Sequence, residues 1–330
     1  MYFKNDQEVM SVGNITDVAE IKVGNIEDTE ALTGCTAIVI EKGATCGVDV
    51  RGSAPGTRET DLLDPVKTVD VVHGICLAGG SAFGLDAASG VMEYLEEENI
   101  GLDVEVAKVP IVPAAVLFDL PMGNAHVRPD KQMGYEAAKQ SYKGAFAFGN
   151  YGAGCGAAVG KLAGFEHSMK GGLGSASVEL DNGLVVGAIV AVNALGEIRH
   201  PETKEVLAGA YNQQTGQMMN SLELLQEGTE HDFLSGANTT IGVVAANSKL
   251  TKAEAQKVAQ VTQNAFAKTI YPAHTTQDGD TVFAVGTGNA TYHVDLVSYL
   301  AQQTMEQAII EAIKAAEAVP CTPSYKSVYQ

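Results

Sequence analysis

The sequence predicts a fold of mixed helices and strands, of the α/β or α+β class, in which layers of sheet are covered by helices. Two observations lead to this prediction. Short apolar runs punctuated by glycine recur through the chain and are typical of strands. A few longer segments instead repeat apolar residues at helical spacing, and they fall between the strand segments. At 330 residues the chain can form one large domain or two ordinary ones.

The N-terminal third is expected to hold strands at 15–23, 36–41 and 46–51, followed by a loop at 51–65. The segment VDVVHGICLAGGSAFGLDAASGVMEYLEEE then predicts a strand, a Gly79-Gly80 turn and a helix. Ser81 is the expected N-cap of this helix, since serine accepts a hydrogen bond from the first turn. The buried face of the helix is expected to carry Phe83, Ala87, Val91 and Leu95.

The rest of the chain continues the alternation. We expect strands at 104–109, 184–193 and 281–288 and helices at 132–142 and 294–319. Residues 200–235 are more polar and predict a flexible loop around one short helix. Thr251 and Glu254 form a capping box before another helix. Thr239 and Thr240 open an apolar run, GANTTIGVVAANSK, that predicts a buried strand.

Composition excludes several classes of protein. The formal charge of −19 argues against binding nucleic acid or an anionic membrane, and no apolar run is long enough for a membrane helix. The first residues lack the pattern of a signal peptide, and the five cysteines are scattered without a C-x-x-C motif, so a cytoplasmic protein is expected. The histidines are equally scattered, so no metal site is predicted.

Two segments resemble a nucleotide-binding and a serine-hydrolase motif, but each lacks residues that its motif requires. The segment GCGAAVGK resembles a phosphate loop, but Cys155 and Leu162 stand where Gly and a hydroxyl are required. The segment GGSAFG lacks the second Gly of a nucleophile elbow, because Phe83 occupies that position. The Gly79-Gly80 pair before a helix could still offer backbone N–H groups to an oxygen or a carboxylate.

Other polar residues are ambiguous when taken alone. Lys161 ends a glycine-rich run, where a solvent-facing lysine is the simplest interpretation. Asn193 could cap a turn, and Asp278-Gly279-Asp280 could be a plain turn before a strand. The threonine at position 239 fits a strand by β-propensity, but it would also suit a catalytic N-terminus exposed by a cut before it.

Together these segments resemble one family. The blocks RGSAPGTRETDLLDP, LAGGSAFGLDAASGVMEYLEE, VGKLAG, VVGAIVAVNALG, NTTIGVVAAN and HTTQDGDTVFAVGTG are similar to signatures of the DmpA-like L-aminopeptidase/D-esterase family. That family includes β-aminopeptidases and the 6-aminohexanoate-oligomer (nylon-oligomer) hydrolases. A threonine after an asparagine, as at Asn238-Thr239, most resembles the nylon-oligomer branch.

The resemblance implies a fold and a maturation step. The fold is a single catalytic domain over residues 1–330, of the α+β class, built as a four-layer αββα sandwich like that of N-terminal nucleophile hydrolases. The precursor cuts itself between Asn238 and Thr239, giving fragments 1–238 and 239–330 that stay together. The resemblance also implies a homo-oligomer, commonly a tetramer, with no cofactor and no metal.

The resemblance also assigns residues. It places Thr239, Lys161, Asn193, Asp278 and Asp280 in the active site, with a peptide or another small amide as the substrate. Substrate contacts are expected near Phe118 and the segment Gly79, Gly80, Ser81. One departure is visible: Val116-Leu117-Phe118 stands where aminopeptidase members have Glu-x-Tyr, which argues against strict recognition of a free amino group.

The chemistry explains why such residues are needed. A threonine hydroxyl needs a base, and a new α-amine with a pKa of about 7.7–8.0 is neutral often enough to serve. Asn193 would donate to the oxyanion, Lys161 would add positive charge, and the two aspartates would orient the nucleophile. Three alternatives stay open: an aminopeptidase or D-esterase acting on short peptides, an acyltransferase like the ornithine acetyltransferases, and an uncut binding protein.

Overall fold

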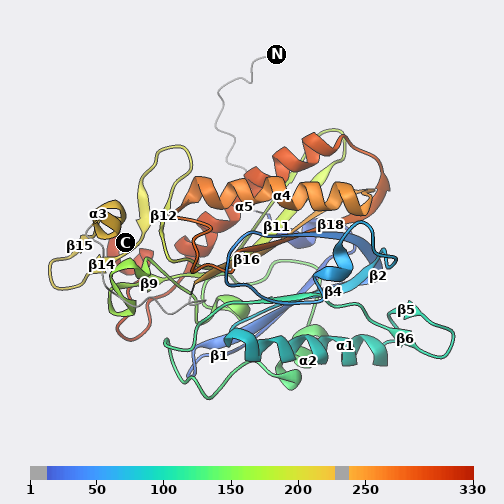
Figure 1. The fold of residues 1–330 in the computed structure, drawn as a ribbon, viewed down its shortest axis with the longest axis horizontal. Helices are drawn as coiled ribbons and strands as arrows, with labels where there is room; N and C mark the ends of the chain where they lie inside the picture. Colours follow the sequence, from blue (N-terminus) through green and yellow to red (C-terminus); the bar gives the residue numbers. More distant parts are fainter. Residues whose placement is uncertain (1–12, 227–237) are drawn as a thin grey trace, which may run out of the picture.

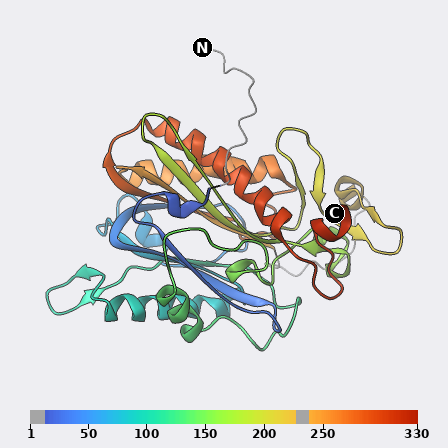
Figure 2. The same cartoon turned by 180° about the vertical axis from the view of Figure 1, so that it is seen from behind.

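The computed structural model describes residues 13–226 and 238–330, which form four layers. Two sheets pack face to face, and a pair of helices covers the outer face of each sheet (Figure 1). Helices α4 (Lys252–Thr269) and α5 (Val294–Ala315) cover one sheet. Helices α1 (Ala87–Glu97) and α2 (Lys131–Lys139) cover the other, and Figure 2 shows the same layers from behind.

The strands follow one hydrogen-bonded path that passes from one sheet to the other along a long strand, β2. The first sheet has the order β10 (Gly172–Glu179), β11 (Val185–Asn193), β16 (Thr239–Ser248), β18 (Thr281–Ala290) and β2 (Thr33–Val50). The second sheet continues from β2 through β4 (Val72–Ala78), β7 (Ala114–Val116) and β3 (Gly56–Arg58), and β1 (Lys22–Asp28) also pairs with β2.

Strand β2 belongs to both sheets. Its residues 45–50 pair with β18, and its residues 33–39 pair with β1 and β4. The neighbours in the first sheet are antiparallel, except that β16 and β18 run parallel. The starts of β16 and β18 therefore lie at the same end of the sheet, where β11 ends.

Three apolar clusters hold the four layers together. Alternate residues of the central strands enter different clusters, as the two-residue period of a strand requires. In β11, Val190 and Val192 pack toward α4 and α5, whereas Ile189 and Ala191 pack between the sheets. A third cluster lies under α1 and α2. Strands buried on both faces explain why the sequence shows continuous apolar runs rather than an alternation.

The remaining strands and helices of the described residues are short. They are the strands β5 (Leu102–Asp103), β6 (Lys108–Val109), β8 (Ala158–Val159), β9 (Met169–Lys170), β12 (Glu197–Arg199), β13 (Val206–Ala208), β14 (Tyr211–Asn212), β15 (Gln217–Met218) and β17 (Ile270–Tyr271), and the helices α3 (Ser221–Gln226) and α6 (Tyr325–Tyr329). Six 3₁₀ segments are also described: Ile15–Asp17, Asp61–Leu63, Ser81–Asp86, Gly152–Gly154, Lys161–Ala163 and Phe165–His167.

Most of the elements expected from the sequence are present. The strand expected at 184–193 is β11, and the strand expected from Thr239 onward is β16. The capping box of Thr251 and Glu254 begins α4, with both reciprocal hydrogen bonds formed. The polar segment 200–235 holds three short strands and α3, and its last part lies outside the described residues.

Several boundaries are wrong in the first third of the chain. Residues 15–23 are not one strand: Asn14 caps the 3₁₀ segment Ile15–Asp17, and β1 begins only at Lys22. The strands expected at 36–41 and 46–51 are parts of the single strand β2. The strand expected at 104–109 is the hairpin of β5 and β6.

The helix expected after the Gly79-Gly80 turn also differs. Ser81 does not cap it: Ser81 has a φ of 55° and begins a 3₁₀ segment, and α1 starts at Ala87. Phe83 lies in the 3₁₀ segment, which has a different period, and is 59% exposed rather than buried. Ala87, Val91 and Leu95 are buried as expected. Within the described residues, we find no helix with the length and apolarity that spanning a membrane demands.

Candidate active site

The residues assigned to the active site meet at the end of the first sheet where β16 begins. Thr239 is the first residue of β16 and pairs across the sheet with Asn193, the last residue of β11. Residues 278–280 immediately precede β18, and Asp278 forms a parallel bridge with Asn238. Ile241 and Ala191 pack between the sheets. Thr239 lies two residues before Ile241 and Asn193 two residues after Ala191, so both face the same inter-sheet layer.

The peptide bond before Thr239 is enclosed. Asn238 and Thr239 are each 2% exposed. The Asn238 carbonyl accepts a hydrogen bond from the Gly279 N–H at 2.9 Å, and the Thr239 hydroxyl donates to the same carbonyl. A Cβ atom on Gly279 would lie only 2.8 Å from Thr239 Oγ1, so glycine is what allows this close approach. A hydroxyl and an adjacent carbonyl, shielded from bulk water, are thus held together in the continuous chain.

Lys161 and Asn193 form a buried pair beside this bond. Lys161 Nζ donates to the Asn193 backbone carbonyl at 2.9 Å and to Asn193 Oδ1 at 3.0 Å. The Ala158 N–H also donates to Oδ1 at 3.0 Å, and Asn193 Nδ2 donates to the Phe118 carbonyl at 3.1 Å. Two donors on one side and an acceptor on the other fix the orientation of the amide.

The lysine is not at the surface. Lys161 alone suggested a solvent-facing side chain, and that interpretation is wrong, because the residue is 3% exposed. Gly160, with a φ of 73°, turns the chain inward before it, and a Cβ there would lie 2.0 Å from the Gly209 carbonyl carbon. Burial lowers the pKa of Lys161 to about 7, although the nearby Asp278 and Asp119 oppose the shift.

Both aspartates accept hydrogen bonds that fix their carboxylates. Thr275 donates to Asp278 Oδ2 from its backbone N–H at 2.7 Å and from its hydroxyl at 2.6 Å. Asp280 Oδ1 accepts the Thr240 N–H at 2.8 Å, and its Oδ2 contacts His274 Nδ1 at 2.9 Å. Burial and the Asp280 charge raise the pKa of Asp278 to about 6, while Thr275 and Lys161 oppose the rise.

Perturbed groups of this kind are frequent in active sites, since burial and charge are used there to bring proton affinities near neutral pH.

The sequence did not single out His274 or Thr275. A threonine three residues before an aspartate is a local pattern that predicts a side chain–backbone turn, so Thr275 had a signal that could have found it. The sequence held no signal for His274, because its contact with Asp280 depends on an uncommon backbone conformation.

The expected substrate-contact segment has internal partners. The N–H groups of Gly79, Gly80 and Ser81 donate to the Gly34 carbonyl at 2.9 Å, to Asp119 Oδ1 at 2.7 Å and to the Leu117 carbonyl at 2.9 Å. Phe118 reaches the site through its backbone carbonyl. Contact between these residues and a substrate stays a prediction. Asp119, missed by the sequence, is 2% exposed, and burial raises its pKa.

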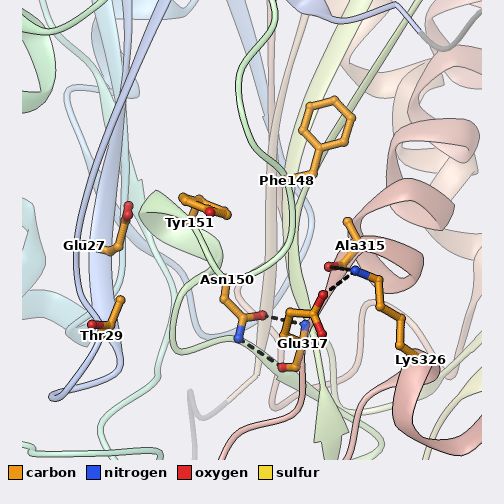
Figure 3. Close-up of a pocket in the computed structure, with 8 residues that line it drawn as sticks. All are labelled: Glu27, Thr29, Phe148, Asn150, Tyr151, Ala315, Glu317 and Lys326. Carbon is orange, nitrogen blue, oxygen red and sulfur yellow. Dashed lines mark hydrogen bonds and ion pairs between the residues drawn. The ribbon is translucent and has the colours of Figure 1, made fainter.

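A separate open groove of about 410 Å³ lies between β1 and the C-terminal segment. Figure 3 shows its lining: Glu27, Thr29, Phe148, Asn150, Tyr151, Ala315, Glu317 and Lys326. None of the assigned active-site residues lines it. Across residues 13–226 and 238–330, no three His, Cys, Asp or Glu side chains are grouped so that they could hold a metal ion.

The fold is shared with solved enzymes of the N-terminal nucleophile hydrolase fold. The L-aminopeptidase D-Ala-esterase/amidase of Ochrobactrum anthropi, described as a variant of that fold, superposes with a TM-score of 0.70 at 17% identity, over 98% of this chain and 92% of that one. A β-aminopeptidase of Burkholderia sp. superposes with a TM-score of 0.64 at 19% identity, over 92% and 87%.

Sequence comparison identifies the family. The sequence model of peptidase family S58 matches residues 13–325, and the chain belongs to this family. An uncharacterised aminopeptidase of Mycobacterium leprae is 39% identical over an alignment that covers 96% of this chain and 94% of the relative. A 6-aminohexanoate-oligomer endohydrolase of Kocuria sp. is 30% identical over 325 residues, 93% and 88%. The chain is a hydrolase of peptide or other amide bonds.

Proposed function

We propose that this protein is a self-processing amide hydrolase whose nucleophile is Thr239, exposed as an N-terminus by a cut after Asn238. The observation that carries the proposal is the contact between the Thr239 hydroxyl and the Asn238 carbonyl at the start of β16. This contact lies beside a buried lysine and a fixed amide, which are groups suited to a reaction that develops charge on a carbonyl oxygen.

The processing step follows from that contact. Thr239 Oγ attacks the carbonyl carbon of Asn238 and loses its proton. The carbon–nitrogen bond then breaks, and the departing nitrogen takes a proton and becomes the α-amine of Thr239. Water hydrolyses the ester that joins Asn238 to Thr239 Oγ, which leaves a carboxylate on Asn238 and a free hydroxyl on Thr239. The Gly279 N–H, already on the Asn238 carbonyl, stabilises the negative oxygen in this step.

Turnover uses the same hydroxyl on a substrate amide. The new α-amine accepts the hydroxyl proton, and its pKa of about 7.7–8.0 makes it a far better base at neutral pH than an ordinary lysine. Attack gives an acyl-enzyme and releases the substrate's amine. Water, activated by the same α-amine, then hydrolyses the acyl-enzyme.

The neighbours have distinct roles. Lys161, with a pKa of about 7, is partly charged near neutrality and favours a neutral α-amine by repulsion. Asn193 contributes its amide to the oxyanion side, and one such donor contributes about 3–4 kcal/mol in well-studied hydrolases. Asp278 and Asp280 hold the start of β16 and balance the positive charge.

The substrate class comes from the relatives and from one local feature. Relatives named aminopeptidase and relatives named 6-aminohexanoate-oligomer endohydrolase both align over most of the chain. Val116-Leu117-Phe118 provides no carboxylate for a substrate's free amino group. We therefore favour hydrolysis of amide bonds within linear peptides or 6-aminohexanoate oligomers over strict removal of an N-terminal residue.

Intact mass and N-terminal sequencing of the purified protein test the proposal. We expect two fragments, the smaller beginning at Thr239, and a single 330-residue chain from a Thr239→Ala variant, with no amidase activity. A Thr239→Ser variant is the matched control and should still be cut. Two fragments from Thr239→Ala would refute the assignment of the nucleophile. Product analysis with and without an added amine acceptor separates hydrolysis from acyl transfer.

A further inference from the structure

His274 makes an unusual contact with Asp280. Its backbone N–H donates to Asp280 Oδ2 at 3.1 Å, and its ring Nδ1 lies 2.9 Å from the same oxygen. The other carboxylate oxygen accepts the Thr240 N–H at 2.8 Å. Asp280 is thus a bridge from His274 to the peptide group that directly follows Thr239.

The backbone of His274 is strained. Its φ of 57° is in the left-handed region, which is uncommon for residues other than glycine, although asparagine, aspartate and histidine adopt it more often than the rest. Such conformations cost free energy and cluster at functional sites. In this conformation both the N–H and the ring reach one oxygen of Asp280. Within the described residues the ring has no other hydrogen bond, since Nε2 is buried and unpartnered.

The bridge lies behind the nucleophile, on the opposite face of the sheet. Val244 of β16 and Val282 of β18 pack toward α4, so Thr240 and Asp280, an even number of residues before them, face that side too. The His274 ring packs against Phe266 of α4, with ring centroids 6.1 Å apart. His274 therefore cannot touch a substrate on the Thr239 side and can act only through Asp280.

Processing makes this bridge important. In the uncut chain the start of β16 is held on both sides, because Asn238 is bonded to Thr239 and its carbonyl accepts the Gly279 N–H. After the cut, Asn238 belongs to the other fragment, and Thr239 is a free chain end. Chain ends fray unless they are tied down. Together with the pairing of β16 to β11, the hydrogen bond from the Thr240 N–H to Asp280 then restrains the backbone next to the nucleophile.

We propose that His274 is a positioning residue, which orients Asp280 so that its carboxylate holds the Thr239–Thr240 peptide of the cut enzyme in place. The inference rests on the proposed function, because it assumes that Thr239 acts as a chain terminus. It assigns to His274 a role in keeping the nucleophile aligned, separate from the folding of the loop before β18.

The test is a His274→Asn variant, because asparagine tolerates the left-handed conformation while removing the imidazole. The matched control is His293→Asn at the exposed N-cap of α5, where asparagine is equally suitable. Both proteins are allowed to process fully, and turnover is divided by the concentration of active sites measured from the acylation burst. Residue-level hydrogen exchange, followed by NMR on protein labelled with ¹⁵N-threonine, reports the Thr240 N–H.

For His274→Asn we expect kcat per active site to fall by roughly tenfold or more with KM nearly unchanged, and Thr240 exchange to accelerate by at least a similar factor. His293→Asn should match the wild-type protein. Unchanged kcat per active site, or unchanged Thr240 exchange, would overturn the proposal, even if the burst amplitude and the melting temperature fell. If His274→Asn does not fold, His274→Gly takes its place with the same expected results.

The two proposals fail in different ways. If the wild-type chain is never cut at Asn238, the proposed function fails and no burst is seen. If the wild-type chain is cut and active, and His274→Asn equals it in both measurements, only the role of His274 fails.

Discussion

Replacing Lys161 by Met should change how stability depends on pH, because the lysine is buried beside Asn193. The pKa of Lys161 is lowered from 10.5 to about 7 by burial. An unfolded chain keeps the proton up to its ordinary pKa, whereas the folded chain releases it near pH 7. The unfolded state thus binds more protons between these values, and the cost of burying the lysine falls as pH rises.

The magnitude follows from the shift. Each pKa unit corresponds to about 1.4 kcal/mol, and at pH 7 the folded state is already half deprotonated, so between pH 7 and pH 9 the free energy of unfolding of the parent should rise by about 2 kcal/mol relative to Lys161→Met. Below pH 7 the difference should level off, because both states then hold the proton. Loss of the lysine charge would also raise the pKa of Asp278 further, which acts in the same direction.

Urea unfolding followed by circular dichroism at pH 6, 7 and 9 measures this difference. Both proteins carry Thr239→Ala, so that each is a single chain and processing does not alter the comparison. Lys257→Met, at an exposed position of α4, shows what the loss of a surface charge does alone. A difference that stays constant from pH 6 to pH 9 would refute the argument that Lys161 is buried and deprotonates near neutrality.

Two further substitutions address the loop before β18. Gly279→Ala should slow both the cut at Asn238 and turnover by on the order of a hundredfold, because the new Cβ would lie 2.8 Å from Thr239 Oγ1. A gel time course measures the rate of the cut, and amide hydrolysis measures turnover. Wild-type rates in both assays would contradict the prediction. Thr275→Val removes the hydroxyl donor to Asp278, which should lower the free energy of unfolding by about 2 kcal/mol in urea. It should also shift the acid limb of the pH–rate profile to higher pH than in the wild type, because the loss of a donor raises the pKa of Asp278. An acid limb at the same pH would show that turnover does not need the ionisation of Asp278.

The sequence located three strands of the first sheet well, but it gave no sign of β10 and divided β2 into two strands. β11, β16 and β18 are buried on both faces, so each appears as a continuous apolar run that needs no knowledge of its neighbours. The capping box could also be predicted from a short segment, because Thr251 and Glu254 are only three residues apart. The failures lie where the chain departs from regular periods: the 3₁₀ segment at Ser81 exposes Phe83, and the one at Ile15–Asp17 replaces an expected strand.

The candidate site divides in the same way. Thr239 and Asp280 adjoin predicted strands, so their place at a strand end could be inferred. The burial of Lys161 could not, because it depends on the Asn193 carbonyl and amide, 32 residues away in sequence, to satisfy the amine. The role of His274 was equally hidden, since a sequence does not reveal a left-handed residue whose ring and N–H meet one carboxylate.

The order of strands in the first sheet has a consequence for the fragments that a cut at Asn238 would leave. β16 and β18 lie between β11 and β2, so the 92 residues after a cut at Asn238 would supply the two middle strands, bordered on both edges by strands of the larger fragment. Dissociation would break two ladders of hydrogen bonds and expose two apolar layers at once. The cut would therefore create a permanent heterodimer, which could be taken apart by denaturant but not by dilution.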